Sequence, residues 1–154
     1  MTGTLVYIPA FLFYTFASWY FWQTRWKHRS VYPVNQSNEP PRVDWKAHLI
    51  MLIPIILHGL ILSQSIFIET GLSFGVGNAI SLIVWLTALI YWFTGFFPRL
   101  KGLQNLFAPI AIVGAIAVLL PLAMPSVRPL ANTDMTAFKM HLLVAMLAYS
   151  LFTI

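Results

Sequence analysis

Histidine is the residue type in this sequence with the most distinctive chemistry. The chain has four histidines and no cysteine. The lack of cysteine excludes disulfides and thiolate metal sites, and histidines on separate segments with few carboxylates do not form a structural zinc site. A neutral imidazole is, however, a standard axial ligand of haem iron. The sequence contains no Walker loop and no HExxH, GxSxG or dinucleotide-binding motif, so it predicts no catalytic site of its own.

His58 is an ionisable residue inside a long apolar segment, residues 47–68. In a helix it lies about 18 Å along this segment, near the middle of a membrane. Ser65 and Glu69 fall on the same helical face, which makes a polar stripe. Ionisable residues at that depth are rare and often functional, so His58 is a candidate site residue. Because an unpaired polar group in hydrocarbon is costly, we expect His58 to face the protein interior rather than lipid. The alternative is an interhelical hydrogen bond that only holds the bundle together.

His141 stands near the beginning of the last apolar segment, residues 139–154, and Tyr149 follows it eight residues later. Ala145, Ala148 and Phe152 share its helical face. Small residues beside an imidazole allow a flat ligand, or another helix, to approach closely. The alternative is an interfacial histidine beside a packing face of small residues.

The composition predicts the elements that must position these histidines. Of the 154 residues, 59% are hydrophobic and only 8% are charged, whereas a soluble domain carries about a quarter. We therefore predict an integral membrane protein, an all-α polytopic bundle with about five transmembrane helices in one membrane domain. The last segment is short and ends without polar residues, which predicts a truncated fifth helix and the N-terminal part of a longer protein. The predicted spans are 4–22, 47–68, 79–97, 106–124 and 139–154.

Lysine and arginine in the loops predict the orientation. The 23–46 and 98–105 segments are richer in these residues than 69–78 and 125–138, so the positive-inside rule places the first two in the cytoplasm and the N-terminus outside. The net charge of +5 therefore indicates membrane topology rather than a nucleic-acid partner. His28 and His48 are expected to be anchors at the cytoplasmic interface. Because the first span has its basic residues after it, we interpret it as uncleaved.

The order of four stretches resembles the cytochrome c assembly family of membrane proteins, the CcsA, ResC and HemX-like proteins, and most closely its HemX-like branch. Together the stretches cover about residues 47–154. They are LHGLIL, LSFGVGNAISLIVWLTALIYW, NLFAPIAIVGAIAVLLPLAMP and MHLLVAMLAYSLFTI, the last with histidine and tyrosine at the family spacing.

The resemblance implies haem as the cofactor. It implies that His141 is an axial ligand at the outer membrane face and that His58 is a second haem-binding residue. The implied function is haem handling in cytochrome c assembly in the bacterial inner membrane, beside other cytochrome c maturation components, as an assembly factor rather than an enzyme. The first alternative is a non-catalytic HemX-like accessory protein that regulates haem synthesis or partners a transport system. The second is a plain structural or transporter subunit.

Overall fold

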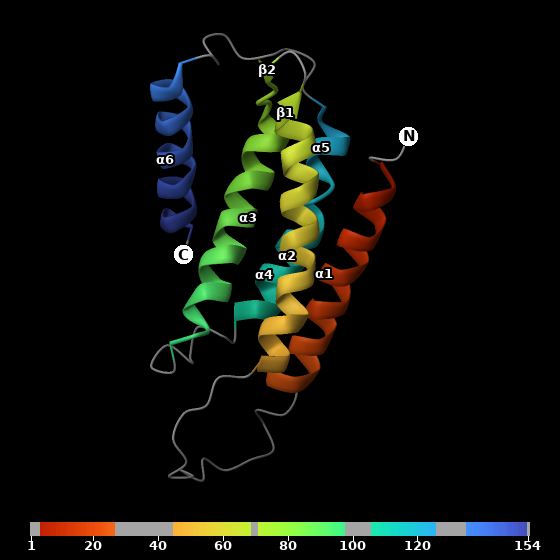
Figure 1. Ribbon diagram of the computed structural model, residues 1–154. Coiled ribbons are helices and arrows are strands. Elements are labelled where there is room, and N and C mark those ends of the chain that lie inside the picture. The colour runs from red at the N-terminus through yellow and green to blue at the C-terminus, as the bar shows by residue number, and fades with distance from the viewer. Residues whose placement is uncertain (1–3, 27–44, 69–70, 98–105, 126–134, 154) are drawn as a thin grey trace.

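The computed structural model describes residues 4–26, 45–68, 71–97, 106–125 and 135–153, and these are almost entirely helical (Figure 1). A 3₁₀ turn at Thr4–Val6 leads into the first helix, and a π-helical turn at Trp22–Trp26 follows it. Two strands of two residues each, β1 at Phe67–Ile68 and β2 at Gly71–Leu72, pair antiparallel as a short hairpin. The α-helices are α1 Tyr7–Phe21, α2 Trp45–Ile66, α3 Val76–Thr94, α4 Phe107–Ala117, α5 Leu120–Ala123 and α6 Thr136–Phe152.

The all-α class is confirmed, and each of the five predicted apolar segments contains a helix. Within the described residues, α2 and α3 have the length and apolar composition to cross a membrane. At 1.5 Å per residue they are about 33 and 28 Å long. The apolar segments Phe107–Ala123 and Thr136–Phe152 are shorter. The number of spans and their orientation stay predictions.

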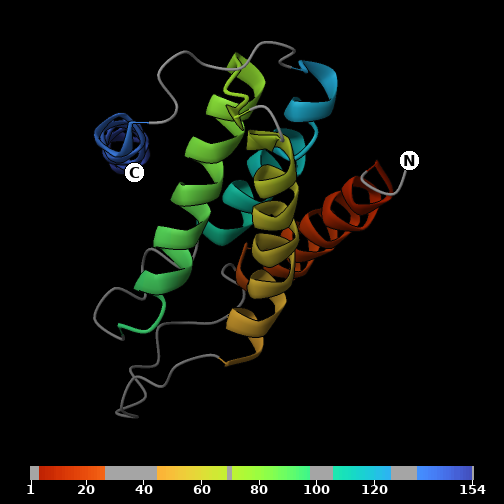
Figure 2. The ribbon, with the colours of Figure 1, turned by 45° about the horizontal axis from the view of Figure 1, so that its top comes forward.

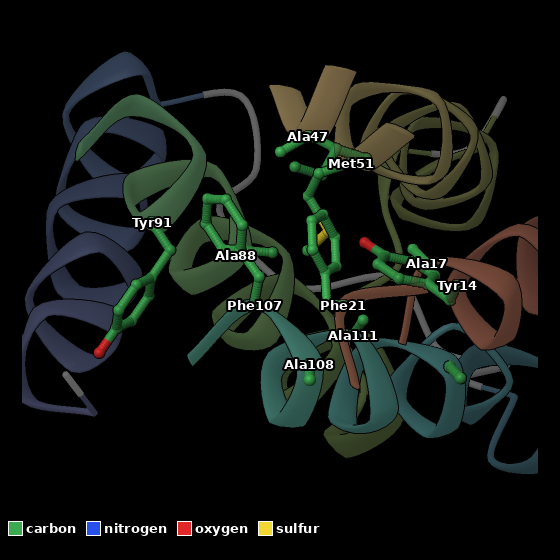
Figure 3. Close-up of a cluster of buried hydrophobic side chains, with 12 residues drawn as sticks. Tyr14, Ala17, Phe21, Ala47, Met51, Ala88, Tyr91, Phe107, Ala108 and Ala111 are labelled. Carbon is green, nitrogen blue, oxygen red and sulfur yellow. The ribbon is translucent and has the colours of Figure 1, made fainter. Parts of the chain in front are cut away.

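Helices α1 to α4 pack in a ring, with α1 against α2 and α4, and α3 against α2 and α4 (Figures 1 and 2). Their shared core combines six large buried side chains with alanines from all four helices (Figure 3). The large side chains are Tyr14, Phe21, Met51, Ile55, Tyr91 and Phe107. Alanine keeps the helix backbones close, and the larger side chains fill the space between them. We refer to α1–α4 as the four-helix unit.

A proline explains why the fourth apolar segment is two helices. Pro121 has no N–H to donate to the carbonyl four residues earlier, that of Ala117, so the regular α-helical ladder stops there. Helix α4 accordingly ends at Ala117, and the short α5 begins at Leu120. The Ala117 carbonyl is left available for a donor from another helix.

The segment 69–78, which the sequence analysis assigns to a loop, is more ordered than expected. Its described part contains β2, and α3 begins at Val76. The buried Asn78 donates from Nδ2 to the carbonyls of Ser65 and Ser73, at 3.2 and 2.9 Å. Asn78 therefore satisfies a carbonyl in the last turn of α2 and holds the hairpin against it.

Helix α6 lies outside the four-helix unit, packs mainly against α3, and diverges from it toward the hairpin (Figures 1 and 2). Ser150 is its one fully buried residue among those described. The Thr87 hydroxyl of α3, which donates to the Ile83 carbonyl at 2.9 Å, also lies 3.5 Å from the Ser150 carbonyl. Most of the predicted cytoplasmic loop 23–46, all of 98–105, and the residues Glu69 and His28 lie outside the described residues.

Candidate functional site

His58 lies near the middle of α2 and is completely buried, as the sequence predicts. Both of its ring nitrogens are hydrogen-bonded. Nδ1 is 3.2 Å from the Tyr14 hydroxyl of α1, and Nε2 is 2.8 Å from the Ser81 hydroxyl of α3. The Tyr14 ring stands edge-on to the imidazole, with ring centroids 5.7 Å apart and an interplanar angle of 88°. His58 therefore connects α2 to two neighbouring helices.

The direction of these hydrogen bonds follows from the second partner of the Ser81 hydroxyl. The Ser81 hydroxyl donates to the Ala117 carbonyl at 2.8 Å, which is the carbonyl left without a helical donor by Pro121. Having used its hydrogen there, Ser81 accepts from His58, so Nε2 carries the ring hydrogen and Nδ1 is an acceptor. Tyr14 then donates to Nδ1. We call this buried series from Tyr14 through His58 and Ser81 to Ala117 the His58 chain; it joins all four helices.

A second polar contact joins α1 to α2 one heptad away. The Tyr7 hydroxyl is 3.1 Å from the Ser65 hydroxyl, which itself donates to the Ile61 carbonyl at 2.8 Å. Tyr7 and Tyr14 are seven residues apart, as are His58 and Ser65. Because α1 and α2 run in opposite directions, the two tyrosines meet the two α2 side chains in matched order. The predicted polar stripe of His58 and Ser65 thus faces α1.

Gly114 of α4 makes room for the Tyr14 ring. A Cβ atom placed at residue 114 would lie 2.7 Å from Cε1 of Tyr14 and 3.0 Å from Cδ1. Real carbon–carbon contacts are wider than this, so only glycine allows the tyrosine ring to lie between α1 and α4 and still reach His58.

His48, which the sequence analysis treats as an interfacial anchor, is buried, with 2% of its surface exposed. It lies in the first turn of α2 among the rings of Trp45, Trp92 and Phe96, the nearest with its centroid 4.5 Å away. The Trp92 indole donates to the His48 carbonyl at 3.0 Å. Gly95 lies directly against the imidazole, and a Cβ there would collide with Nε2. Aromatic rings from the first turn of α2, from α3 and from the turn that follows α3 therefore cover this histidine.

His141 has the opposite environment, because its side chain is exposed near the N-terminal end of α6. Nine residues separate it from the buried Ser150, and at 100° per residue they point to opposite sides of the helix. Since Ser150 packs on α3, His141 faces away from the four-helix unit. Ala145 and Ala148 lie on this outward side, as the sequence predicts.

The three described histidines differ in how well they fit a haem iron. At His58, iron would have to displace Tyr14 or Ser81 from a fully packed interior, so the hydrogen bonds favour the packing alternative. At His141 the imidazole is accessible, and the small side chains beside it leave space for a flat ligand. In the described ranges no group of three or more histidine, cysteine or acidic side chains is positioned to hold a metal ion. Of the described histidines, His141 alone presents an exposed imidazole.

The sequence analysis missed Tyr14, Ser81 and Pro121, which determine the surroundings of His58. A signal was present in two of them. Tyr14 follows Tyr7 by the seven residues that also separate His58 from Ser65, and Ser81 is polar within a long apolar segment.

Comparison with protein-family models, with curated proteins and with solved structures finds no match for this chain.

Proposed function

We propose that this protein is an integral membrane protein of the bacterial inner membrane that handles haem at the outer membrane face during cytochrome c assembly, with His141 as an axial ligand. The resemblance of its ordered segments to that family motivates the haem role. The observation that carries the proposal is the accessibility of His141, since the other two described histidines are buried. An iron ligand must present an accessible nitrogen, and among the described histidines His141 is the one whose side chain is exposed.

The distribution of polar and apolar side chains supports the membrane location. Buried polar residues, such as His58, Asn78 and Ser81, are hydrogen-bonded inside the bundle. Large apolar side chains cover the outside, with Ile8, Ile56 and Ile116 each at least half exposed. Apolar surface on this scale is favourable next to lipid and unfavourable in water. We propose five spans, with the α2–α3 hairpin at the outer face.

An absorption spectrum of the purified protein tests the haem role. With haem added, the wild type should show a Soret band, and His141→Ala should abolish or shift it. Added imidazole should restore part of the band by filling the vacant coordination position. His48→Phe is the matched control, because it removes a buried imidazole and should leave the band unchanged. A wild-type spectrum from His141→Ala would rule out the ligand assignment.

A second candidate is the HemX-like accessory role, in which no haem is presented. The burial of His48 and His58 inside the bundle favours it, because neither side chain is exposed to a ligand. In that case the wild type would bind no haem and would still sediment with membranes. A change in cellular haem synthesis on deletion of the protein would support the accessory role.

A further inference from the structure

An apolar cavity lies where α6 diverges from the four-helix unit, at the hairpin end of the molecule. Its volume is about 320 Å³, near the lower end for small-molecule sites. The lining comes from α2, the hairpin, α3 and the first half of α6, and it includes Ile66, Leu72, Leu82, Met140 and Leu143. Lys139 is the one charged residue in this lining.

The position of Lys139 gives the cavity a cationic rim. Lys139 is exposed and lies in the first turns of α6, a helix with no acidic residue in its first turn. The backbone N–H groups at a helix N-terminus add partial positive charge. The cavity thus combines apolar walls with a site that favours an anion at its mouth.

We infer that this cavity binds an anionic phospholipid, with part of an acyl chain between α6 and α3 and the phosphate beside Lys139. This inference rests on the membrane location proposed above, which places the hairpin end at headgroup level. A helix of a partner protein is too large for this cavity, because a helix with its side chains is about 10 Å across. A haem bound through His141 would lie elsewhere, since Lys139 and His141 are 200° apart around α6.

Native mass spectrometry of the full chain, purified in detergent with equal amounts of dioleoyl-phosphatidylglycerol and dioleoyl-phosphatidylcholine, tests the inference. The wild type should retain phosphatidylglycerol in preference. Lys139→Ala should lower that retention about fivefold, the effect of one basic residue near anionic lipid, while Lys139→Arg should preserve it. Lys46→Ala is the matched control, because Lys46 is an exposed lysine at the opposite end of the bundle and its loss should leave the selectivity unchanged.

A variant that fills the cavity separates its volume from the charge. Leu143→Trp should reduce retention of both lipids with little change in thermal stability. Equal retention of the two lipids by the wild type would overturn the inference, as would an equal effect of Lys46→Ala and Lys139→Ala. Displacement of the lipid by haemin, one for one, would make the cavity a haem site instead.

The outcomes also separate this inference from the proposed function. A chain that stays in the aqueous phase after cell fractionation would contradict the membrane location itself. A membrane-embedded chain that loses haem on His141→Ala but shows no lipid preference would contradict the lipid site alone.

Discussion

His58 in the four-helix unit and His141 on α6 show how differently one side chain is treated in two regions of the molecule. The first is fully buried and hydrogen-bonded at both nitrogens, and the second is exposed on a helix that packs mainly against one neighbour. In the four-helix unit, polar groups face inward and find partners. On α6 the imidazole faces outward. The contrast assigns packing to the first histidine and leaves the second available for a ligand.

The largest expected effect comes from filling the space that Gly114 leaves for Tyr14. Gly114→Leu should lower the free energy of unfolding by about 3 kcal/mol, because the new side chain displaces the Tyr14 ring and breaks its bond to His58. Thermal unfolding in detergent micelles measures this. Ala145→Leu, an enlargement on the outward side of α6, should change stability little. Equal effects from the two variants would remove the contrast between the regions.

Removing the imidazole from the interior should have the next largest effect. His58→Ala leaves a cavity and deprives the Tyr14 hydroxyl of its acceptor, so we expect a loss of about 2–3 kcal/mol in the free energy of unfolding. Denaturant titration followed by circular dichroism measures the loss. If the folded fraction of His58→Ala keeps the haem spectrum of the wild type, the result agrees with a packing role for His58. A stable variant without haem would instead make His58 a ligand.

The hydroxyl of Tyr14 should contribute less than the whole His58 side chain. Tyr14→Phe should lower the free energy of unfolding by about 1 kcal/mol, since hydrogen bonds between membrane helices average below that value and reach somewhat above it. Tyr7→Phe is the control and should cost less, because Ser65 keeps its bond to the Ile61 carbonyl.

Nitrogen NMR of the wild-type protein tests the direction of the hydrogen bonds in the His58 chain. In the wild type, the ring hydrogen of His58 should be on Nε2. A hydrogen on Nδ1 would contradict the direction assigned from Pro121 and Ala117.

The smallest effect on stability should come from His141. His141→Ala should change the free energy of unfolding by less than about 0.5 kcal/mol, because an exposed residue loses little contact on truncation. The same thermal unfolding assay measures it. A loss as large as that of His58→Ala would mean that another part of the protein buries this imidazole, and the ligand role would then need a different basis.

The sequence was sufficient to predict the helical class, the location of the five apolar segments and the burial of His58, because long apolar runs and one ionisable residue among them depend on local composition. It did not predict the partners of His58. Tyr14, Ser81 and the Ala117 carbonyl come from three other helices, and only the packing of α1, α3 and α4 brings them together. The burial of His48 depends in the same way on Trp92 of α3 and on Phe96 in the turn that follows α3.

The matched heptads of α1 and α2 have a consequence for assembly of the bundle. If α1 slides along α2 by seven residues, about 10.5 Å, Tyr7 takes the place of Tyr14 beside His58. The misregistered pair keeps one polar contact but leaves Ser65 without a tyrosine and sets the Tyr14 hydroxyl opposite Met51, an apolar neighbour. Tyr14 also no longer lies against Gly114, and a phenol ring then has to fit elsewhere. In the shifted register Gly114 accommodates the Tyr7 ring, and the Tyr14 ring lies opposite a part of α4 that has no glycine. Gly114 therefore makes room for one phenol ring only, and the second tyrosine distinguishes the two registers.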